Sequence, residues 1–321
     1  MATLLLLIAA SIFFAMNMGV SGFSVALAPS YGSGLLKKNK AVFFYFVGIL
    51  VGGILIGPRV VETLTKHISQ QQINAVSGLL ILSAAGITLF LSNLLKIPQS
   101  TSFVTVASFL GSGLYYGKVH WDTILKIVGV AAIFSAISFF ATFLLMKKLY
   151  PPRQKNLKLY EFFHIKRRHV KKFIIGHDVY SAFGIGTNNI ANVVAPLISS
   201  LNIVPLYTLA AGALFFSAGA YFFGERVIKT VSHHIIPLGE ISASVVSVMT
   251  ASLVIAASVL GLPTPYVQFT TFAVLGVSCA KDGARQTFEK NIFKRILLVW
   301  LCVPVVTVFL SLFLHFIFLK K

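Results

Sequence analysis

Seven apolar runs, most of them as long as a membrane-spanning helix, constrain this chain more than any other feature of its sequence. A helix needs roughly 20 predominantly apolar residues to cross a bilayer. Inside lipid, only helices and closed barrels satisfy the hydrogen bonds of the backbone. We therefore expect an all-α polytopic membrane protein with spans at Ala2–Ala15, Ala41–Gly57, Ile73–Leu91, Ile124–Met146, Leu206–Phe223, Ile241–Leu260 and Ile296–Leu319.

The charge distribution indicates the same class of protein. Only 11% of the residues are charged, against about 25% in ordinary soluble domains, and the net charge is +19. In a soluble chain this charge would suggest nucleic-acid binding, but here Lys and Arg cluster between the apolar runs, as in cytoplasmic loops. The N-terminal run lacks the basic start and cleavage site of a secretory signal, so we interpret it as a retained span. We expect a location in the cytoplasmic membrane, with membrane lipids and not nucleic acid as partners.

An internal repeat divides the chain. "GPRVVETLTKHI" begins at Gly57 and "GERVIKTVSHHI" begins at Gly224, an offset of 167 residues, and six of the twelve positions are identical. The same offset aligns Gly19 with Gly186. Repeats of inverted topology are typical of secondary transporters, which bind their substrate between the two copies. We predict two inverted-topology repeats joined by a basic cytoplasmic linker, with the boundaries 1–146, 147–172 and 173–321.

Each predicted repeat contains two segments that are too polar or too rich in glycine for a lipid-facing helix. Irregular backbone is tolerated at membrane depth only where it is buried in protein or lines an aqueous cavity. We interpret these segments as broken or re-entrant helices around a binding site, and we expect their prolines to mark helix starts. The segments are Asn17–Gly34 with Pro29, Ile97–Gly113 with Pro98, Gly184–Leu197 with Pro196, and Leu262–Gly276 with Pro263.

The segment that begins at Gly186 reads "GTNNIANVVAPL" and contains Asn188, Asn189 and Asn192. Small residues in membrane helices are common packing residues. A buried amide, in contrast, needs a hydrogen-bond partner, because burying it alone in hydrocarbon costs several kcal/mol. Three amides within five positions therefore indicate a binding site for a polar ligand.

The chain resembles the inorganic phosphate transporter (PiT) family over nearly its whole length. That family carries a "GANDVANA"-type motif in each half, followed by a Pro-x-Ser-Thr-Thr-His-type motif. "GTNNIANVV" from Gly186 is similar to the first motif and "GVSGFSVAL" from Gly19 is a degenerate copy, while "PQSTSF" from Pro98 and "PTPYVQ" from Pro263 stand at the second motif. The resemblance implies an inverted-repeat fold with scaffold and transport regions, and a homodimer.

The departures from the family pattern concern the anion. Gly22 and Asn189 replace the two aspartates, and Phe103 and Gln268 stand near the positions of the histidines. In "GTNNIANVVAPL", "IPQSTS" and "GVSCAKDGARQ" the chain is similar to the CysP-type sulfate permeases, a branch of the family. Sulfate is fully ionised and only accepts hydrogen bonds, so an amide donor suits it and a carboxylate opposes it. These residue types favour sulfate over phosphate, with thiosulfate, molybdate and selenate as alternatives.

The donors for the anion must be neutral, because no Arg or Lys lies in the four polar segments. Helix N-termini attract anions through their free N–H groups, and hydroxyl and amide side chains can complete such a site. The hydroxyls after Pro98 also suit N-capping of their own helix. We predict substrate-binding roles for Ser21, Gly22, Ser100, Thr101, Ser102, Asn188, Asn189, Asn192, Gln268 and Thr270.

We expect transport to be coupled to protons. The resemblance implies that sodium sites of the family use the motif aspartates, which are absent here, so a proton carried by a membrane carboxylate is favoured. Asp178 and Glu240 are the candidates, and ordinary acids at helix ends would look the same. We expect no metal ion and no other cofactor.

Other classes of function remain open from the sequence. An anion-selective channel would use similar donors. A membrane enzyme acting on lipid phosphates would need a base or nucleophile paired with an acid or a metal, whereas the eight acidic residues lie singly along the chain. We therefore predict a non-enzymatic, secondary active importer of inorganic sulfate that is coupled to protons. A sodium- or proton-coupled transporter of phosphate or another tetrahedral oxyanion is the alternative.

Overall fold

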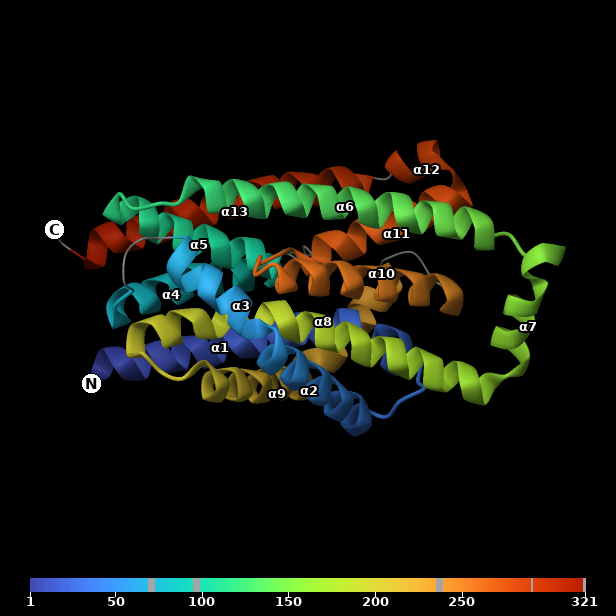
Figure 1. Ribbon diagram of the computed structural model, residues 1–321, viewed down its shortest axis with the longest axis horizontal. Coiled ribbons are helices and arrows are strands. Elements are labelled where there is room, and N and C mark those ends of the chain that lie inside the picture. The colour runs from blue at the N-terminus through green and yellow to red at the C-terminus, as the bar shows by residue number, and fades with distance from the viewer. Residues whose placement is uncertain (69–72, 95–98, 235–238, 290, 320–321) are drawn as a thin grey trace.

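The regular structure of the protein is helical (Figure 1). The computed structural model describes residues 1–68, 73–94, 99–234, 239–289 and 291–319. The helices are α1 (Ala2–Ala26), α2 (Lys38–Leu55), α3 (Gly57–Glu62), α4 (Ala75–Leu94), α5 (Thr101–Tyr116), α6 (Trp121–Leu149), α7 (Leu157–Ile165), α8 (Arg167–Leu201), α9 (Pro205–His234), α10 (Glu240–Val259), α11 (Tyr266–Asp282), α12 (Ala284–Phe288) and α13 (Asn291–Phe318).

Seven helices in the described part of the chain are long and apolar enough to cross a membrane, and each overlaps one of the expected runs. Large apolar side chains such as Leu125, Phe140 and Phe309 point outward from them and are exposed, as lipid-facing side chains would be. The prediction of an all-helical, multi-pass membrane protein is therefore confirmed. The spans are Ala2–Ala26, Lys38–Leu55, Ala75–Ser92, Trp121–Leu149, Pro205–Glu225, Glu240–Val259 and Leu298–Phe318.

Helix packing follows the sequence repeat. Helix α1 packs along α9, and α2 packs along α8. The offset of 167 residues relates α1 to α8 and α2 to α9, so each of these contacts is the repeat-related copy of the other. The contacts of α6 with α11 and of α13 with α5 are related in the same way. Inversion of the repeats and the boundaries 1–146, 147–172 and 173–321 stay predictions.

Two repeat-related glycines lie where these helices cross. A Cβ atom added to Gly19 of α1 would overlap the carbonyl oxygen of Phe216 in α9. A Cβ atom added to Gly186 of α8 would overlap the carbonyl oxygen of Ile49 in α2. Small residues allow membrane helices to approach this closely. The aligned glycines of the two motifs therefore set the distance between helices on which the site is built.

Helices α5 and α11 begin in the middle of the molecule and run towards its opposite ends (Figure 1). They have 16 and 17 residues, which gives each a length of about 25 Å at 1.5 Å per residue, less than the ~30 Å of a bilayer core. Their N-termini therefore lie inside the protein at mid-depth. This is the geometry expected of broken helices.

The expectation that four prolines mark helix starts is wrong for Pro196. Pro196 lies inside α8, which continues without a break to Leu201. Helices in membranes tolerate an internal proline when neighbouring groups satisfy the freed backbone. Pro29 lies in a π-helical turn, Ala28–Gly32, and Pro263 lies in the loop just before α11. Pro98 lies outside the described residues.

Candidate anion-binding site

The three asparagines lie together on α8, in the buried middle of this 35-residue helix. Asn188 and Asn192 are four residues apart and therefore share one face of the helix. That face meets the beginning of α5 and the loop that leads into α11, so side chains from three segments of the chain converge there.

Ser102 connects α5 to the asparagines. Its hydroxyl donates to Asn188 Oδ1 at 3.0 Å, lies 3.4 Å from Asn189 Oδ1, and accepts a hydrogen bond from Asn192 Nδ2 at 3.0 Å. Two residues earlier, the Ser100 hydroxyl oxygen caps α5 by accepting from the Phe103 N–H at 3.2 Å. The capping alternative is therefore correct for Ser100, whose own O–H remains available as a donor.

Asn188 connects α8 to the other broken helix. Its Oδ1 accepts from the backbone N–H of Thr264 at 3.1 Å, while its Nδ2 donates to Ser258 Oγ at 2.9 Å and to the Leu262 carbonyl at 3.1 Å. Thr187 adds a hydrogen bond to Ser258 at 3.0 Å. Both ends of the Asn188 amide are thus used by the protein, so this side chain holds the elements together and is poorly suited to bind an anion.

Several polar atoms beside this network are left without protein partners. Asn189 Nδ2 and Thr101 Oγ1 form no hydrogen bond with any described residue. Asn192 Oδ1 and both polar atoms of the Gln99 amide are buried, again without a partner in the described ranges. Buried polar groups are nearly always satisfied, so an ordered water or a polar ligand is the expected partner of these atoms. None of the hydrogen bonds of the asparagines or of Ser102 involves a charged side chain among the described residues.

The other predicted residues do not join the network in the structure. Thr270 donates to the carbonyl of Tyr266 in its own helix at 3.0 Å. Gln268 is buried in the first turn of α11, and Ser21 is half-buried in α1, but neither contacts the asparagines through a hydrogen bond within the described residues. They stay predicted ligands without a contact that supports them.

Gly22 has a neighbour that the sequence did not reveal. A Cβ atom added at this position would overlap the hydroxyl of Tyr45, which donates to the Gly19 carbonyl at 3.2 Å. The Tyr45 phenol therefore fills the space beside the motif copy that begins at Gly19. A larger residue cannot replace Gly22 without moving the Tyr45 side chain.

The family assignment rests on the length of the match. A family model described as "Phosphate transporter family" matches residues 18–311. The chain belongs to this family. It is therefore a multi-pass anion transporter, and the alternative of a membrane enzyme is excluded.

Individual relatives within the family differ in their anions. Sulfate permease CysP of Bacillus subtilis (strain 168) is 33% identical over 319 residues, which cover 97% of this chain and 86% of that protein. A relative from Helicobacter pylori (strain J99) is 24% identical over 385 residues, covering 91% and 72%, and its name gives phosphate as the inferred cargo. The structure of a sodium-dependent phosphate transporter superposes with a TM-score of 0.79 at 21% identity, covering 99% of both chains, and shows the common fold.

Replacement of Ser102 by alanine tests its connecting role. The change leaves Asn192 Nδ2 without its acceptor and removes a donor from Asn188, and an unmade buried hydrogen bond costs about 1–3 kcal/mol. We expect the KM for the transported anion to rise about tenfold, as measured by initial rates of uptake. Ser108→Ala is the matched control, because among the described residues the Ser108 hydroxyl bonds only within α5, to Thr105 O at 2.8 Å. Equal kinetics of the two variants would contradict the role.

Proposed function

We propose that this transporter imports sulfate across the cytoplasmic membrane and that protons drive the uptake. The observation that carries the proposal is the Nδ2 group of Asn189, which lies beside the start of α5 and forms no hydrogen bond with the described residues. A dianion that only accepts hydrogen bonds needs donors, and this amide, the Thr101 hydroxyl and the N–H groups at the start of α5 are all donors. The 33% identity to a sulfate permease supports the same anion.

Phosphate is the second candidate, and the residue at position 189 argues against it. Near neutral pH, phosphate keeps a proton on at least one oxygen and gains from a nearby acceptor. The amide oxygen of Asn189 already lies 3.4 Å from the Ser102 hydroxyl. The amide oxygens of Gln99 and Asn192, which have no partner among the described residues, are neutral acceptors, weaker than a carboxylate. Sulfate and its tetrahedral analogues carry no such proton and need only the donors.

We propose Asp178 as the residue that couples transport to protons. Its side chain is fully buried in α8, eleven residues before Asn189, and its Oδ2 accepts from the Ser30 N–H at 2.9 Å. Buried carboxylates in membrane proteins are typical of proton pathways. Glu240 is a weaker candidate, because it lies in the first turn of α10, half-exposed and paired with Arg167 at 3.1 Å. The expected homodimer and lipid contacts stay predictions.

Uptake of radiolabelled sulfate into proteoliposomes tests the proposal. We expect saturable uptake that is stimulated by an inward proton gradient, is insensitive to sodium, and is only weakly inhibited by excess phosphate. Liposomes without protein, and proteoliposomes with the proton gradient collapsed by an ionophore, are the controls. Strong inhibition by phosphate together with stimulation by sodium would favour the second candidate. Uptake that does not saturate would indicate a channel.

A further inference from the structure

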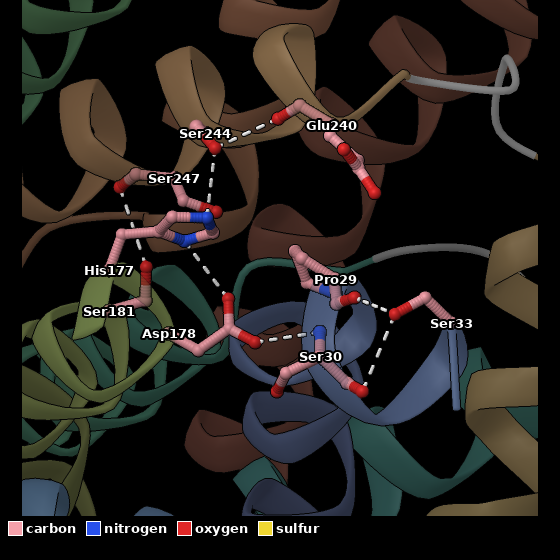
Figure 2. A network of polar contacts seen from close by, with 9 residues as sticks. All are labelled: Pro29, Ser30, Ser33, His177, Asp178, Ser181, Glu240, Ser244 and Ser247. Atoms are coloured by element: carbon pink, nitrogen blue, oxygen red, sulfur yellow. Dashed lines mark hydrogen bonds and ion pairs between the residues drawn. The ribbon is translucent and has the colours of Figure 1, made fainter. Parts of the chain in front are cut away.

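A buried polar cluster joins α8, α10 and the turn Ala28–Gly32 (Figure 2). It contains His177 and Asp178 of α8, Ser244 of α10 and Ser30 of the turn, all of them buried. His177 lies between Ser244 and Asp178 and contacts both, while Asp178 reaches across to Ser30. The cluster therefore connects the second half of the chain to the segment that directly follows the motif copy "GVSGFSVAL".

The hydrogen bonds of Ser244 allow a proton to be assigned to one nitrogen of His177. The Ser244 hydroxyl lies 2.8 Å from the Glu240 carbonyl oxygen and 3.0 Å from His177 Nε2. A carbonyl can only accept, so we assign the single proton of Ser244 to the Glu240 carbonyl. With that assignment, the Ser244 oxygen accepts from His177, and the Nε2 atom of His177 carries a proton.

The other nitrogen of His177 faces the carboxylate. His177 Nδ1 lies 3.0 Å from Asp178 Oδ1, and neither atom has a hydrogen-bond partner of standard geometry among the described residues. With Nε2 protonated, a neutral imidazole would hold the unprotonated Nδ1 atom 3.0 Å from an oxygen of an ionised Asp178. A contact of 3.0 Å between two acceptors is repulsive. One additional proton between the two atoms turns it into an attraction, either as imidazolium with carboxylate or as imidazole with carboxylic acid.

We propose that His177 and Asp178 together hold the transported proton, and that this proton fixes the turn Ala28–Gly32 against α8. The other oxygen of the same carboxyl group, Oδ2, accepts the Ser30 N–H at 2.9 Å. Removal of the shared proton leaves the two acceptors in contact, so the Asp178 side chain must turn away from His177. The bond to Ser30 then breaks and releases the turn.

Release of the turn Ala28–Gly32 acts on the end of α1, which carries the motif copy that begins at Gly19. Helix α1 ends at Ala26, two residues before the turn, and Ser30 also holds the chain beyond the turn through a hydrogen bond from Leu36 N–H to its carbonyl at 3.0 Å. Movement of this turn therefore changes the position of the segment that contains Gly22. The inference deepens the proposed function, since it rests on proton coupling and names the pair that carries the proton.

Few other titratable groups lie near the pair. Tyr266 of α11 lies against Ser181, one turn along α8, and is close enough to Asp178 to interact with it; a phenol is neutral at physiological pH. Glu240 and Arg167 form their own ion pair at the exposed end of the cluster. The ring of Phe173 covers the imidazole, with ring centres 5.6 Å apart. Within the described residues, Asp178 is thus the acid that His177 contacts.

Hydrogen exchange of the turn tests the inference without any transported anion. Amide exchange of residues 27–36 is measured by mass spectrometry from about pH 5 to about pH 9, which brackets the ordinary pKa of histidine, and is corrected for intrinsic rates. In the wild type we expect protection at low pH that is lost as pH rises. Asp178→Asn mimics the neutral acid, since its amide donates to His177 and its oxygen accepts from Ser30, so protection should persist at every pH. Asp178→Ala should remove the protection at every pH.

The matched control is His315→Gln. His315 is also buried in a membrane-spanning helix, but its ring contacts a backbone carbonyl, that of Ser311, at 2.7 Å. We expect this variant to keep the wild-type pH dependence of the turn. Protection in the wild type that does not change with pH would overturn the inference, and so would equal pH dependence in the wild type and Asp178→Asn.

Transport measurements separate this inference from the proposed function. In Asp178→Asn we expect sulfate uptake driven by a proton gradient to fall about tenfold, within the usual range of coupling between two sites. Sulfate–sulfate counterflow without a gradient should stay within about twofold, because one-for-one exchange of sulfate involves no net movement of protons. Loss of counterflow as well would place Asp178 in anion binding and overturn the inference. If the wild type itself takes up no sulfate, the proposed function fails, while the exchange experiment still decides whether the pair holds the turn.

Discussion

Asn189→Asp is expected to reverse the anion preference of this transporter. The substitution keeps the shape of the side chain, replaces the free Nδ2 donor with an acceptor and adds a negative charge. Sulfate would then face a carboxylate with no proton between them. An unmade buried hydrogen bond to a charged group costs about 3 kcal/mol, which corresponds to a fall in sulfate kcat/KM of roughly 100-fold.

Phosphate responds differently to the same change. A protonated phosphate oxygen can donate to the new carboxylate, so part of the loss is recovered. We therefore expect the ratio of phosphate to sulfate uptake to rise in Asn189→Asp, measured in proteoliposomes with both labelled anions. The rise should be larger at low pH, where phosphate carries more protons.

Asn189→Ala separates the effect of the charge from the loss of the donor. Alanine removes the amide without adding an acceptor, so uptake of both anions should fall and their ratio should change little. A ratio that shifts equally in the alanine and aspartate variants would show that the charge is not the cause. Unchanged rates and selectivity in Asn189→Asp would remove this residue from the site.

The membrane-spanning helices could be predicted because hydropathy over about 20 residues depends on composition alone. The location of all seven apolar runs is correct for this reason. Continuity of the helix through Pro196 could not be predicted, since it depends on neighbouring helices that hold the backbone on both sides of the proline. Local signals such as proline indicate where a helix can break, and tertiary packing decides whether it does.

Residues of the candidate site could be recognised in the sequence where their type alone, a buried amide or hydroxyl, marked them as unusual. Asn189, Asn192 and Ser102 lie together, because buried amides and hydroxyls need one another, and their role in anion binding stays a prediction. Ser258 and Tyr45 were missed, since a serine or a tyrosine in an apolar helix gives no signal until its neighbours are known.

The missed residue with the clearest sequence signal is His177. It directly precedes Asp178, which the sequence offered as a candidate membrane carboxylate, and a histidine beside such an acid could have drawn attention to the pair. The roles that distinguish Asn188 from Asn189 could not be predicted in this way. They depend on which amide atoms the protein already uses, and sequence does not contain that information.

Gly186→Ala is expected to destabilise the contact between α8 and α2 strongly. The new Cβ atom would overlap the backbone carbonyl of Ile49, and a backbone atom in a packed helix cannot rotate away as a side chain can. Overpacking of this kind costs about 3 kcal/mol or more. Separation of α8 from α2 would also move the asparagines relative to α5, so we expect loss of thermal stability in detergent together with loss of uptake.

The repeat makes this prediction sharper. Gly19→Ala should have a similar effect, because its Cβ atom would overlap the Phe216 carbonyl in the repeat-related contact between α1 and α9. Gly176→Ala is the matched control on the same helix as Gly186, since a Cβ atom there meets nothing within 4 Å. Alanine is favoured over glycine in a helix by about 1 kcal/mol, so the control should be neutral or slightly more stable. Equal melting temperatures for Gly176→Ala and Gly186→Ala would mean that α2 and α8 have room to separate, and the close crossing would then not be what positions the amides.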